Sequence, residues 1–317
     1  MRKVQLGNTD LEITPIIFGG NVFGWTLNEE ESFRILDAFI ARGFNAIDTA
    51  NNYSYWVPGN VGTESERIIG NWIKSRGNRD KIILATKVGG RNLIQDKPNT
   101  TKSHILKEVE ESLLRLNTDY IDLYQTHYDD TKTPVEETLS AYNQLVKEGK
   151  VRYIGASNFS SERLIESLEK SDLFNLPAYK TLQPEYNLYD RQSFEEFLQP
   201  VAEKFKLGVI PYYSLASGFL SGKYRNEEDL DKSTRGEGIK KYLNERGFRI
   251  LDALATISTR HSISYSAVSL AWLIEQKSVI APITSATKEE HLDAFLEAIN
   301  VQLSHDDLKL LSEASEY

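Results

Sequence analysis

Short apolar segments alternate with longer amphipathic segments along nearly the whole chain. Short continuous apolar runs are typical of buried strands in parallel sheets, because both faces of such strands are covered. In the longer segments the apolar residues recur every three to four positions, which predicts helices. Eight strands are expected, at residues 16–18, 46–47, 82–86, 121–125, 151–156, 181–184, 208–212 and 279–283.

The predicted helices lie between and after these strands. Residues 30–43 end in a glycine, a common helix stop, and Thr63 followed by Glu66 has the spacing of a capping box. Ser304 is expected to cap a last helix at residues 304–315. The other predicted helices cover residues 62–77, 101–116, 133–150, 160–170, 191–206, 242–261 and 287–299.

Eight strands alternating with eight helices favour an α/β fold in which parallel βαβ units close into a (β/α)8 TIM barrel. Residues 4–6 and 11–13 predict an N-terminal β-hairpin, and 304–315 is an extra C-terminal helix. The main alternative is an open doubly wound sheet, but no GxGxxG follows an early strand. No linker interrupts the pattern, so residues 1–317 are expected to form a single domain.

Composition narrows the class of protein. The chain has 317 residues, a net charge of −9 and no cysteine. The negative charge argues against nucleic acid as a partner, and the missing cysteines exclude disulfides and thiolate chemistry. The N-terminus lacks the apolar core of a signal peptide, and no apolar run is long enough to span a membrane. These features predict a cytoplasmic protein without a membrane partner, and they leave the oligomeric state open.

The candidate chemistry follows from the barrel, whose active sites lie where the strands end. Asp48, Lys87 and His127 stand at the ends of three successive predicted strands, and Tyr53 lies just beyond the first of these. A buried ammonium is expected to lower the pKa of the Tyr53 phenol, while Asp48 pairs with Lys87 and His127 donates a hydrogen bond. Such a set is a proton donor that requires no metal, and it suits carbonyl reduction.

Each of these residues alone has a commoner structural interpretation. A strand-end aspartate often caps a turn, a rim tyrosine usually packs, and a strand-end lysine usually extends to water. A single histidine is more often structural than catalytic. The joint occurrence of the four residues on neighbouring strands favours the functional interpretation.

Around these residues the chain resembles the aldo-keto reductase superfamily over nearly its whole length, most of all the microbial branch related to potassium-channel β subunits. The matching segments include FGGNVFGW, IDTANNYSYWVPGNVGTESERIIGNWIKSRGNRDK, ATKVGG, DYIDLYQTHYDD, VRYIGASNF, QPEYNLYDR, PYYSLASGFLSGKY and LAWLIEQKSVIAPITSAT. The resemblance implies a (β/α)8 barrel that reduces an aldehyde or ketone to an alcohol with NADP(H). It also implies a catalytic tetrad of Asp48, Tyr53, Lys87 and His127, with Tyr53 as proton donor.

The resemblance further implies a cofactor site. By position, the contacts to the nicotinamide carboxamide are Ser157, Asn158 and Gln183, and Tyr212 stacks on the ring. The pyrophosphate loop corresponds to Ser214, Leu215, Ser217, Gly218, Leu220 and Lys223, a Gly-Ser-rich stretch whose amides can hold phosphate. The 2′-phosphate contacts correspond to Arg235 and Thr287, and Lys288 is a further candidate. The charges of Arg235 and Lys288 favour NADP(H).

Three positions near the adenosine depart from the pattern of this branch. His291, Ala294 and Phe295 replace its usual Gln, Glu and Asn, so use of NAD(H) as well stays open. A cationic His291 is expected to compensate in part near a phosphate.

The substrate pocket is expected on the rim loops. Aromatic walls suit apolar or aromatic carbonyl compounds, or sugar rings. Arg91 could meet an anionic substrate, although a solvated arginine is the commoner case. The predicted wall residues are Phe23, Trp25, Tyr55, Trp56 and Tyr128.

Two other functions stay open. One is a redox-sensing or regulatory subunit that binds cofactor with little turnover, like the channel β subunits. Those subunits carry Asn at the fourth tetrad position, whereas this chain has His127, which favours catalysis. The other is a barrel isomerase or aldolase in which Lys87 forms a Schiff base.

Overall fold

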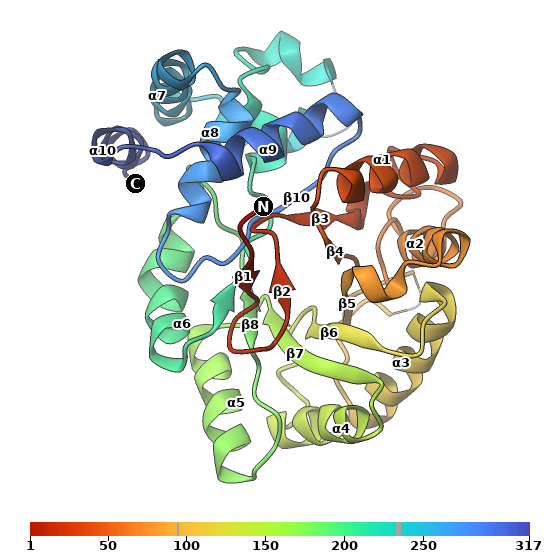
Figure 1. Ribbon diagram of the computed structural model, residues 1–317. Helices are drawn as coiled ribbons and strands as arrows, with labels where there is room; N and C mark the ends of the chain where they lie inside the picture. The colour runs from red at the N-terminus through yellow and green to blue at the C-terminus, as the bar shows by residue number, and fades with distance from the viewer. Residues whose placement is uncertain (94, 233–235) are drawn as a thin grey trace.

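The computed structural model describes residues 1–93, 95–232 and 236–317. Within these residues, eight parallel strands form one sheet in the order β10-β3-β4-β5-β6-β7-β8-β9, which curls into a ring (Figure 1). The strands are β3 (Ile17–Gly19), β4 (Ala46–Asp48), β5 (Ile83–Val88), β6 (Ile121–Thr126), β7 (Val151–Ser157), β8 (Thr181–Gln183), β9 (Gly208–Val209) and β10 (Ile283–Thr284).

Hydrogen bonds between the last two strand segments close the ring. The amide of Ile280 donates to the carbonyl of Val209 and that of Ile283 donates to the carbonyl of Pro211, both at 2.8 Å. The predicted (β/α)8 barrel is therefore confirmed. Regular pairing here is shorter than the predicted strands at 208–212 and 279–283, because Pro211 and Pro282 have no N–H to donate.

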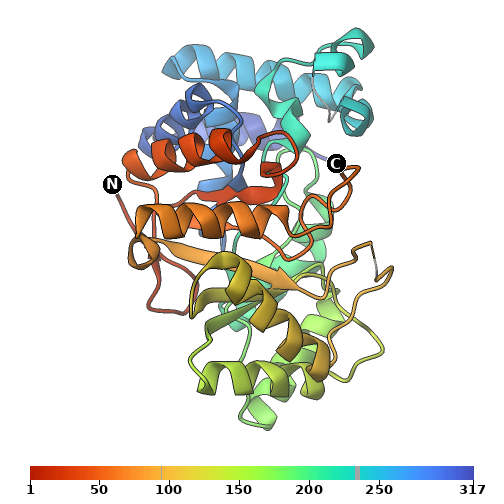
Figure 2. The same ribbon diagram turned by 90° about the vertical axis from the view of Figure 1, so that its right-hand side faces the viewer.

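The predicted N-terminal hairpin closes one end of the barrel. Strands β1 (Val4–Gln5) and β2 (Glu12–Ile13) pair antiparallel, and Leu6 and Leu11 pack among the residues that fill the barrel interior. Figure 1 shows the hairpin in front of the strands, and Figure 2 shows it opposite the loops that follow β4 and β5. The open end of the barrel is therefore the end at which the parallel strands finish.

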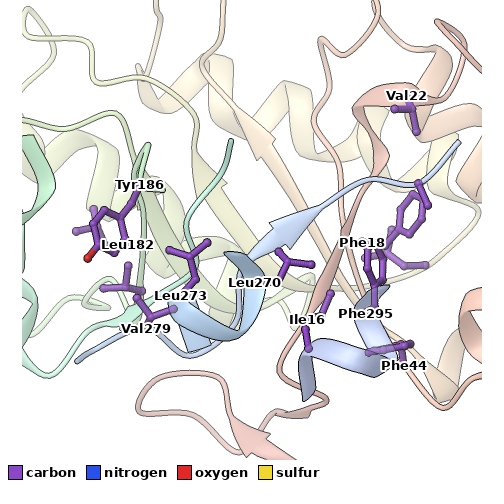
Figure 3. Packing of buried hydrophobic residues seen from close by; sticks show 14 of the residues in the cluster. Ile16, Phe18, Val22, Phe44, Leu182, Tyr186, Leu270, Leu273, Val279 and Phe295 are labelled. Carbon is purple, nitrogen blue, oxygen red and sulfur yellow. The ribbon is translucent and has the colours of Figure 1, made fainter. Parts of the chain in front are cut away.

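Eight α-helices surround the sheet in the described chain, and two more lie outside this ring (Figure 1). Each ring helix turns an apolar face to the strands; Figure 3 shows Leu270 and Leu273 of α8 and Phe295 of α9 packed in this way. The ring contains α1 (Glu29–Ala41), α2 (Glu64–Arg76), α3 (Lys102–Leu116), α4 (Val135–Lys147), α5 (Ser161–Leu173), α6 (Gln199–Phe205), α8 (Tyr265–Ile274) and α9 (Asp293–Asn300), and the outer helices are α7 (Glu245–His261) and α10 (His305–Ala314).

Helix α8 was not predicted from the hydrophobic pattern. Seven of its ten residues are buried, so it has no broad polar face and no amphipathic period. The predicted helix at 242–261 corresponds to α7, which packs outside α8 and against the C-terminal α10. The seventh ring helix is therefore α8, and the prediction assigned that place to the wrong segment.

Two details of the predicted helices also differ. The segment 191–206 contains a π-helical turn at Phe194–Leu198 before α6, because Pro200 cannot donate the next helical hydrogen bond. Short 3₁₀ helices that were not predicted occupy Gly20–Val22, Arg79–Lys81, Ala216–Ser221, Glu227–Lys232 and Gly236–Tyr242. The first turn of the helix predicted at 287–299 is also 3₁₀, at Glu289–Leu292, and leads into α9.

One predicted helix cap is confirmed and the other is wrong. Ser304 caps α10 in a capping box with Asp307. Thr63 makes no side-chain cap. The other half of the predicted capping box is also missing, because Glu66 is fully buried and pairs with Arg115 at 2.6 Å. Among the described residues, no helix combines the length and the apolar character needed to cross a bilayer.

Candidate active site

The four residues of the predicted tetrad lie together at the open end of the barrel. Asp48 is the last residue of β4, Lys87 is near the end of β5, and His127 directly follows β6. These strands are neighbours in the sheet, so their ends carry the three side chains to one place. Tyr53 reaches the same place from the loop after β4, where its hydroxyl lies 2.8 Å from Nζ of Lys87.

Lys87 is the centre of this group and is completely buried. Its Nζ donates to Oδ2 of Asp48 at 2.5 Å, to the carbonyl of Thr49 at 2.8 Å and to the hydroxyl of Tyr53. Burial lowers the pKa of Lys87, and the Asp48 carboxylate opposes that shift. The three ammonium hydrogens all have acceptors, which stabilises the protonated amine. A protonated amine has no lone pair for a Schiff base, so the geometry disfavours the aldolase-like alternative.

The carboxylate of Asp48 is held from both sides. Its Oδ1 accepts hydrogen bonds from Nε2 of Gln125 at 2.9 Å and from Nε2 of Gln183 at 3.1 Å, while Oδ2 is left to Lys87. A buried ion pair is stable only when its remaining hydrogen-bonding groups are satisfied, as they are here. The sequence analysis did not identify Gln125, because only the pairing of β5 with β6 places it beside the tetrad.

The electrostatics of Tyr53 differ from the expectation. Burial, followed by the Asp48 carboxylate, raises the pKa of Tyr53 well above its usual value, whereas the sequence analysis predicted a lowered pKa. The reason is that a phenolate here would lose water and face a carboxylate, and that carboxylate already balances most of the Lys87 charge. The phenol therefore stays protonated over the physiological pH range and is available as a donor.

His127 is neutral in this setting. Burial, with the Lys87 charge as a second cause, holds the pKa of His127 well below its usual value. Its Nδ1 is buried and has no hydrogen-bond partner in the described part of the chain, which favours the tautomer that carries its proton on Nε2. A Cβ at Gly90 would approach this Nδ1 to 2.8 Å, so only glycine fits beside the ring.

One cavity of about 1280 Å³ runs from the tetrad to the region between the 3₁₀ helix Ala216–Ser221 and α9. This volume exceeds the usual range for small-ligand pockets, about 300–1,000 Å³, and has room for an elongated ligand. Lys87 lies beneath the cavity wall and is not among its lining residues. Of the predicted site residues, the lining includes Asp48, Tyr53, His127, Ser157, Asn158, Gln183, Tyr212, Ser214, Leu215, Ser217, Gly218, Lys223, Thr287, Lys288, His291, Trp25, Tyr55, Trp56 and Tyr128.

The residues predicted to meet a nicotinamide carboxamide form a connected network. Ser157 donates to the carbonyl of Gln183 at 2.8 Å, and Tyr212 donates to Oδ1 of Asn158 at 2.8 Å. Asn158 also donates to the carbonyl of His127 at 2.9 Å, and it adopts a left-handed backbone with φ 54°. Amide and hydroxyl groups held in this way next to an aromatic ring have the chemistry that a carboxamide-bearing ring requires.

The loop after β9 has the backbone expected of an anion site. Ala216, Ser217 and Gly218 have φ values of 48°, 57° and 102°, and successive turns of this kind can direct amides into one concavity. Leu220 differs from its predicted neighbours, because its side chain is fully buried and its amide donates to the carbonyl of Leu215. The structure therefore does not bring Leu220 to the cavity.

The far end of the cavity carries two lysines, Lys223 and Lys288. Lys223 forms no ion pair with a described residue, whereas Lys288 pairs with Glu290 at 3.3 Å and is largely exposed. Burial lowers the pKa of His291, and the charges of Lys223 and Lys288 also lower it. The Nδ1 of His291 accepts a hydrogen bond from the amide of Thr287. His291 is therefore neutral, contrary to the cationic role expected for it. The predicted contact Arg235 lies outside the described residues.

The substrate end of the cavity has aromatic walls. The rings of Trp25 and Trp56 meet edge to face at 5.6 Å, and Trp56 also contacts Tyr53 and Tyr55. Phe23, which was predicted to join this wall, is fully buried and stacks on Phe18 in the core. The structure therefore brings Trp25, Tyr55, Trp56 and Tyr128 to the cavity, but not Phe23.

Comparison with known proteins agrees with this geometry. The model of the aldo/keto reductase family matches residues 15–316. This chain belongs to that family. It is 34% identical to Aldo-keto reductase YhdN of Bacillus subtilis, with 98% of this chain and 92% of that protein covered. It is 30% identical to the probable aryl-alcohol dehydrogenase AAD4 of Saccharomyces cerevisiae, covering 90% and 88% of the two chains.

A third relative is a probable voltage-gated potassium channel subunit beta of Oryza sativa, at 29% identity over 95% of this chain and 92% of that protein. The family and the names of its enzymes support an oxidoreductase that acts on carbonyl compounds. Proteins of this family generally bind a nicotinamide cofactor. The cavity volume, the left-handed loop and the amide network fit a dinucleotide, with Ser157, Asn158 and Gln183 at one end and Lys223 at the other.

Proposed function

We propose that this aldo-keto reductase converts an aldehyde or ketone into an alcohol with NADP(H), and that Tyr53 donates the proton. The observation that carries the proposal is the buried contact between the Tyr53 hydroxyl and the Lys87 ammonium on the wall of the long cavity. The nicotinamide, when bound, supplies a hydride to the carbonyl carbon. The carbonyl oxygen, which gains negative charge, takes the proton of Tyr53. The Nε2–H of His127 donates a hydrogen bond that orients this oxygen.

Lys87 and Asp48 assist this proton transfer. As Tyr53 loses its proton, the Lys87 ammonium at 2.8 Å stabilises the phenolate that forms, and Asp48 keeps Lys87 charged. The neutral state of His127 is consistent with a hydrogen-bond donor rather than with the acid itself. Aromatic walls favour an apolar or aromatic carbonyl compound, in agreement with the aryl-alcohol name of one relative.

Preference for NADP(H) over NAD(H) is proposed from the two lysines at the far end of the cavity, where Lys223, Lys288 and Thr287 would meet the phosphates. The proposal is tested by following NADPH consumption with 4-nitrobenzaldehyde for the wild type, Tyr53→Phe and Tyr55→Phe, with a repeat in NADH. Tyr53→Phe should bind NADPH normally and lose nearly all turnover, whereas Tyr55→Phe serves as the matched aromatic control. Equal turnover in Tyr53→Phe and the wild type would refute the assignment of the donor.

A further inference from the structure

Gln125 of β6 has no role in the proposal above, yet it is completely buried directly beneath the tetrad. Its Nε2 donates to Oδ1 of Asp48 at 2.9 Å, and its Oε1 accepts from Nε2 of Gln183 at 3.1 Å. Gln183 itself donates to the same Oδ1 at 3.1 Å. Gln125, Gln183 and Asp48 therefore close a triangle of hydrogen bonds.

This triangle joins two parts of the site that have different tasks. Gln183 lines the cavity beside Ser157 and Asn158, where the carboxamide is proposed to bind. Asp48 holds Lys87, which in turn contacts Tyr53. Because both hydrogens of the Gln183 amino group are used within the triangle, the oxygen of its amide is left for the ligand. The triangle thus links the side chain that faces the ligand to the carboxylate that holds Lys87.

The space around Gln125 confines it to this arrangement. The neighbouring residue on β7 is Gly155, where a Cβ would lie 3.0 Å from Cγ of Gln125 and 2.3 Å from Oγ1 of Thr181. A Cβ at residue 155 would clash with Thr181 and crowd Gln125, and glycine avoids both contacts. The side chain is thus fixed by packing as well as by its hydrogen bonds.

We propose that Gln125 is a positioning residue that couples the nicotinamide end of the cofactor site to the proton donor, an inference that rests on the function proposed above. It does so by directing Oδ1 of Asp48 to the two glutamines and Oδ2 to Lys87. The proton donor Tyr53 is surrounded by other titratable side chains. These are Asp48, Lys87, His127, Tyr128, Tyr212 and Tyr213.

Gln125→Met keeps the volume of the side chain and removes its hydrogen bonds. It should lower kcat by about tenfold or more and weaken binding of the nucleotide by several-fold, because two buried polar groups lose a partner. The matched control is Tyr124→Phe on the same strand, which removes a buried hydroxyl that has no partner among the described residues. Both variants are compared by kcat, by nucleotide Kd from fluorescence titration, and by Tm.

Gln125→Glu separates positioning from packing. The introduced carboxyl can donate to Asp48 only when it is protonated, and the neighbouring carboxylate raises the pKa of that group. Activity relative to wild type should therefore be recovered at acidic pH and lost as the pH rises through the raised pKa. A structural role alone would change Tm without this change in the pH profile.

The outcomes separate the two proposals. If wild type reduces the aldehyde and Gln125→Met matches Tyr124→Phe in kcat, Kd and pH profile, Gln125 only packs, and the inference is overturned. If the wild type shows no turnover, the proposed function fails, and the inference then depends on the nucleotide Kd alone. An unchanged Kd in Gln125→Met would overturn it in that case, and a weakened Kd confined to that variant would support it.

A second inference concerns Arg91, and it comes from different observations. Arg91 lines the cavity near the tetrad and makes no ion pair with a described residue. Its carbonyl accepts a hydrogen bond from Asn52 at 2.6 Å, which holds the loop against the site. The carboxylates on the cavity wall all have other partners, namely Asp48 with Lys87, Glu31 with the amide of Asn28, Glu290 with Lys288, Asp293 with Arg42 and Glu297 with Ser264.

We infer that Arg91 binds an anionic group on the substrate, so that the preferred substrates are aromatic carbonyl compounds that carry a carboxylate. The Arg91 guanidinium has no acidic partner among the described residues and lies beside aromatic walls. It therefore suits an aromatic ligand that carries a carboxylate. This inference also rests on the proposed function.

The test compares 4-carboxybenzaldehyde with its methyl ester in the wild type, Arg91→Ala and Arg34→Ala. Arg34 is an exposed arginine of α1, and Arg34→Ala is the control for the loss of one positive charge from the protein. Arg91→Ala should lower kcat/KM for the acid by about three- to fivefold, the range for an exposed ion pair, and leave the ester unchanged. Equal losses for acid and ester, or an equal loss in Arg34→Ala, would overturn the inference.

If the wild type reduces neither compound, the proposed function fails, and binding of 4-carboxybenzyl alcohol and its methyl ester decides the role of Arg91. Tighter binding of the acid in the wild type but not in Arg91→Ala would support the anion site, and no difference would overturn it.

Discussion

The two ends of the cavity are built on different principles. At the tetrad, Asp48 and Lys87 come from the ends of strands, are completely or almost completely buried, and have every polar group paired. At the other end, Lys223 and Lys288 come from loops and are exposed. Interactions excluded from water are strong and fixed in geometry, whereas exposed charges are screened. The tetrad end therefore suits a catalytic step, and the lysine end suits binding of the cofactor and discrimination between cofactors.

Among the changes that leave Tyr53 in place, Lys87→Met should have the largest effect on turnover. It removes the charge that stabilises the Tyr53 phenolate and leaves Asp48 without its counter-ion. A positioned acid contributes about 10²–10⁴-fold to the rate, so kcat should fall by about 10³-fold. Stopped-flow measurement of NADPH oxidation gives the rate, and a fluorescence titration shows whether the nucleotide still binds. Retention of kcat within tenfold would mean that Tyr53 does not depend on Lys87.

Asp48→Asn should have the largest effect on stability. The change leaves the buried Lys87 ammonium without an anionic partner, which typically destabilises a protein by about 3–5 kcal/mol. Urea unfolding followed by circular dichroism measures the change in the free energy of unfolding. The control is Asp293→Asn, which breaks the exposed pair with Arg42 and should change that free energy by less than about 1 kcal/mol. Similar values for both variants would contradict the contrast between the two ends.

The buried His127 should make stability depend on pH. Its pKa in the folded protein lies well below its usual value, so the unfolded chain binds the additional proton as the pH falls. The stabilising contribution is complete above the ordinary histidine pKa and is lost as the pH decreases from that value toward the folded pKa. The expected slope is at most about 1.4 kcal/mol per pH unit.

This slope is measured by urea unfolding between pH 7 and pH 5. His127→Gln should reduce it, whereas His305→Gln should not, because that histidine is exposed at the start of α10. The same slope in His127→Gln as in the wild type would show that other groups cause it.

The smallest effects are expected at the phosphate end. Lys223→Met should raise the KM for NADPH by about fivefold, because exposed charge pairs contribute about 1 kcal/mol or less, and the effect should diminish in high salt. Lys288→Met should have a smaller effect, since Lys288 already pairs with Glu290. Neither change should alter kcat. An equal rise in the KM for NADH would place Lys223 away from the 2′-phosphate.

A large part of this organisation could be predicted from the chain alone. Alternation of apolar runs with amphipathic segments led to the barrel, since each strand and helix carries its own burial pattern. Asp48, Lys87 and His127 could be predicted to meet because parallel strands of one barrel end on the same side. The capping box at Ser304 and the hairpin at the N-terminus were equally local features.

Other features depended on contacts between distant segments. Helix α8 is buried on most sides and had no periodic signal, and Glu66 was diverted from its cap by Arg115 of α3. The pKa of Tyr53 rises rather than falls, because burial and the placement of Asp48 outweigh the nearby ammonium. Gln125 enters the site only through the register of β5 with β6 and the missing Cβ of Gly155.

The sequence by itself determined the strands, the amphipathic helices and the end of the barrel that carries the polar residues, because these follow from local periodicity and chain direction. The tertiary structure alone decided which side chains reach the cavity, so that Trp25 lines it while Phe23 lies in the core. It also decided the protonation of Tyr53 and His127. Desolvation and hydrogen bonding between distant residues exist only once the chain has folded.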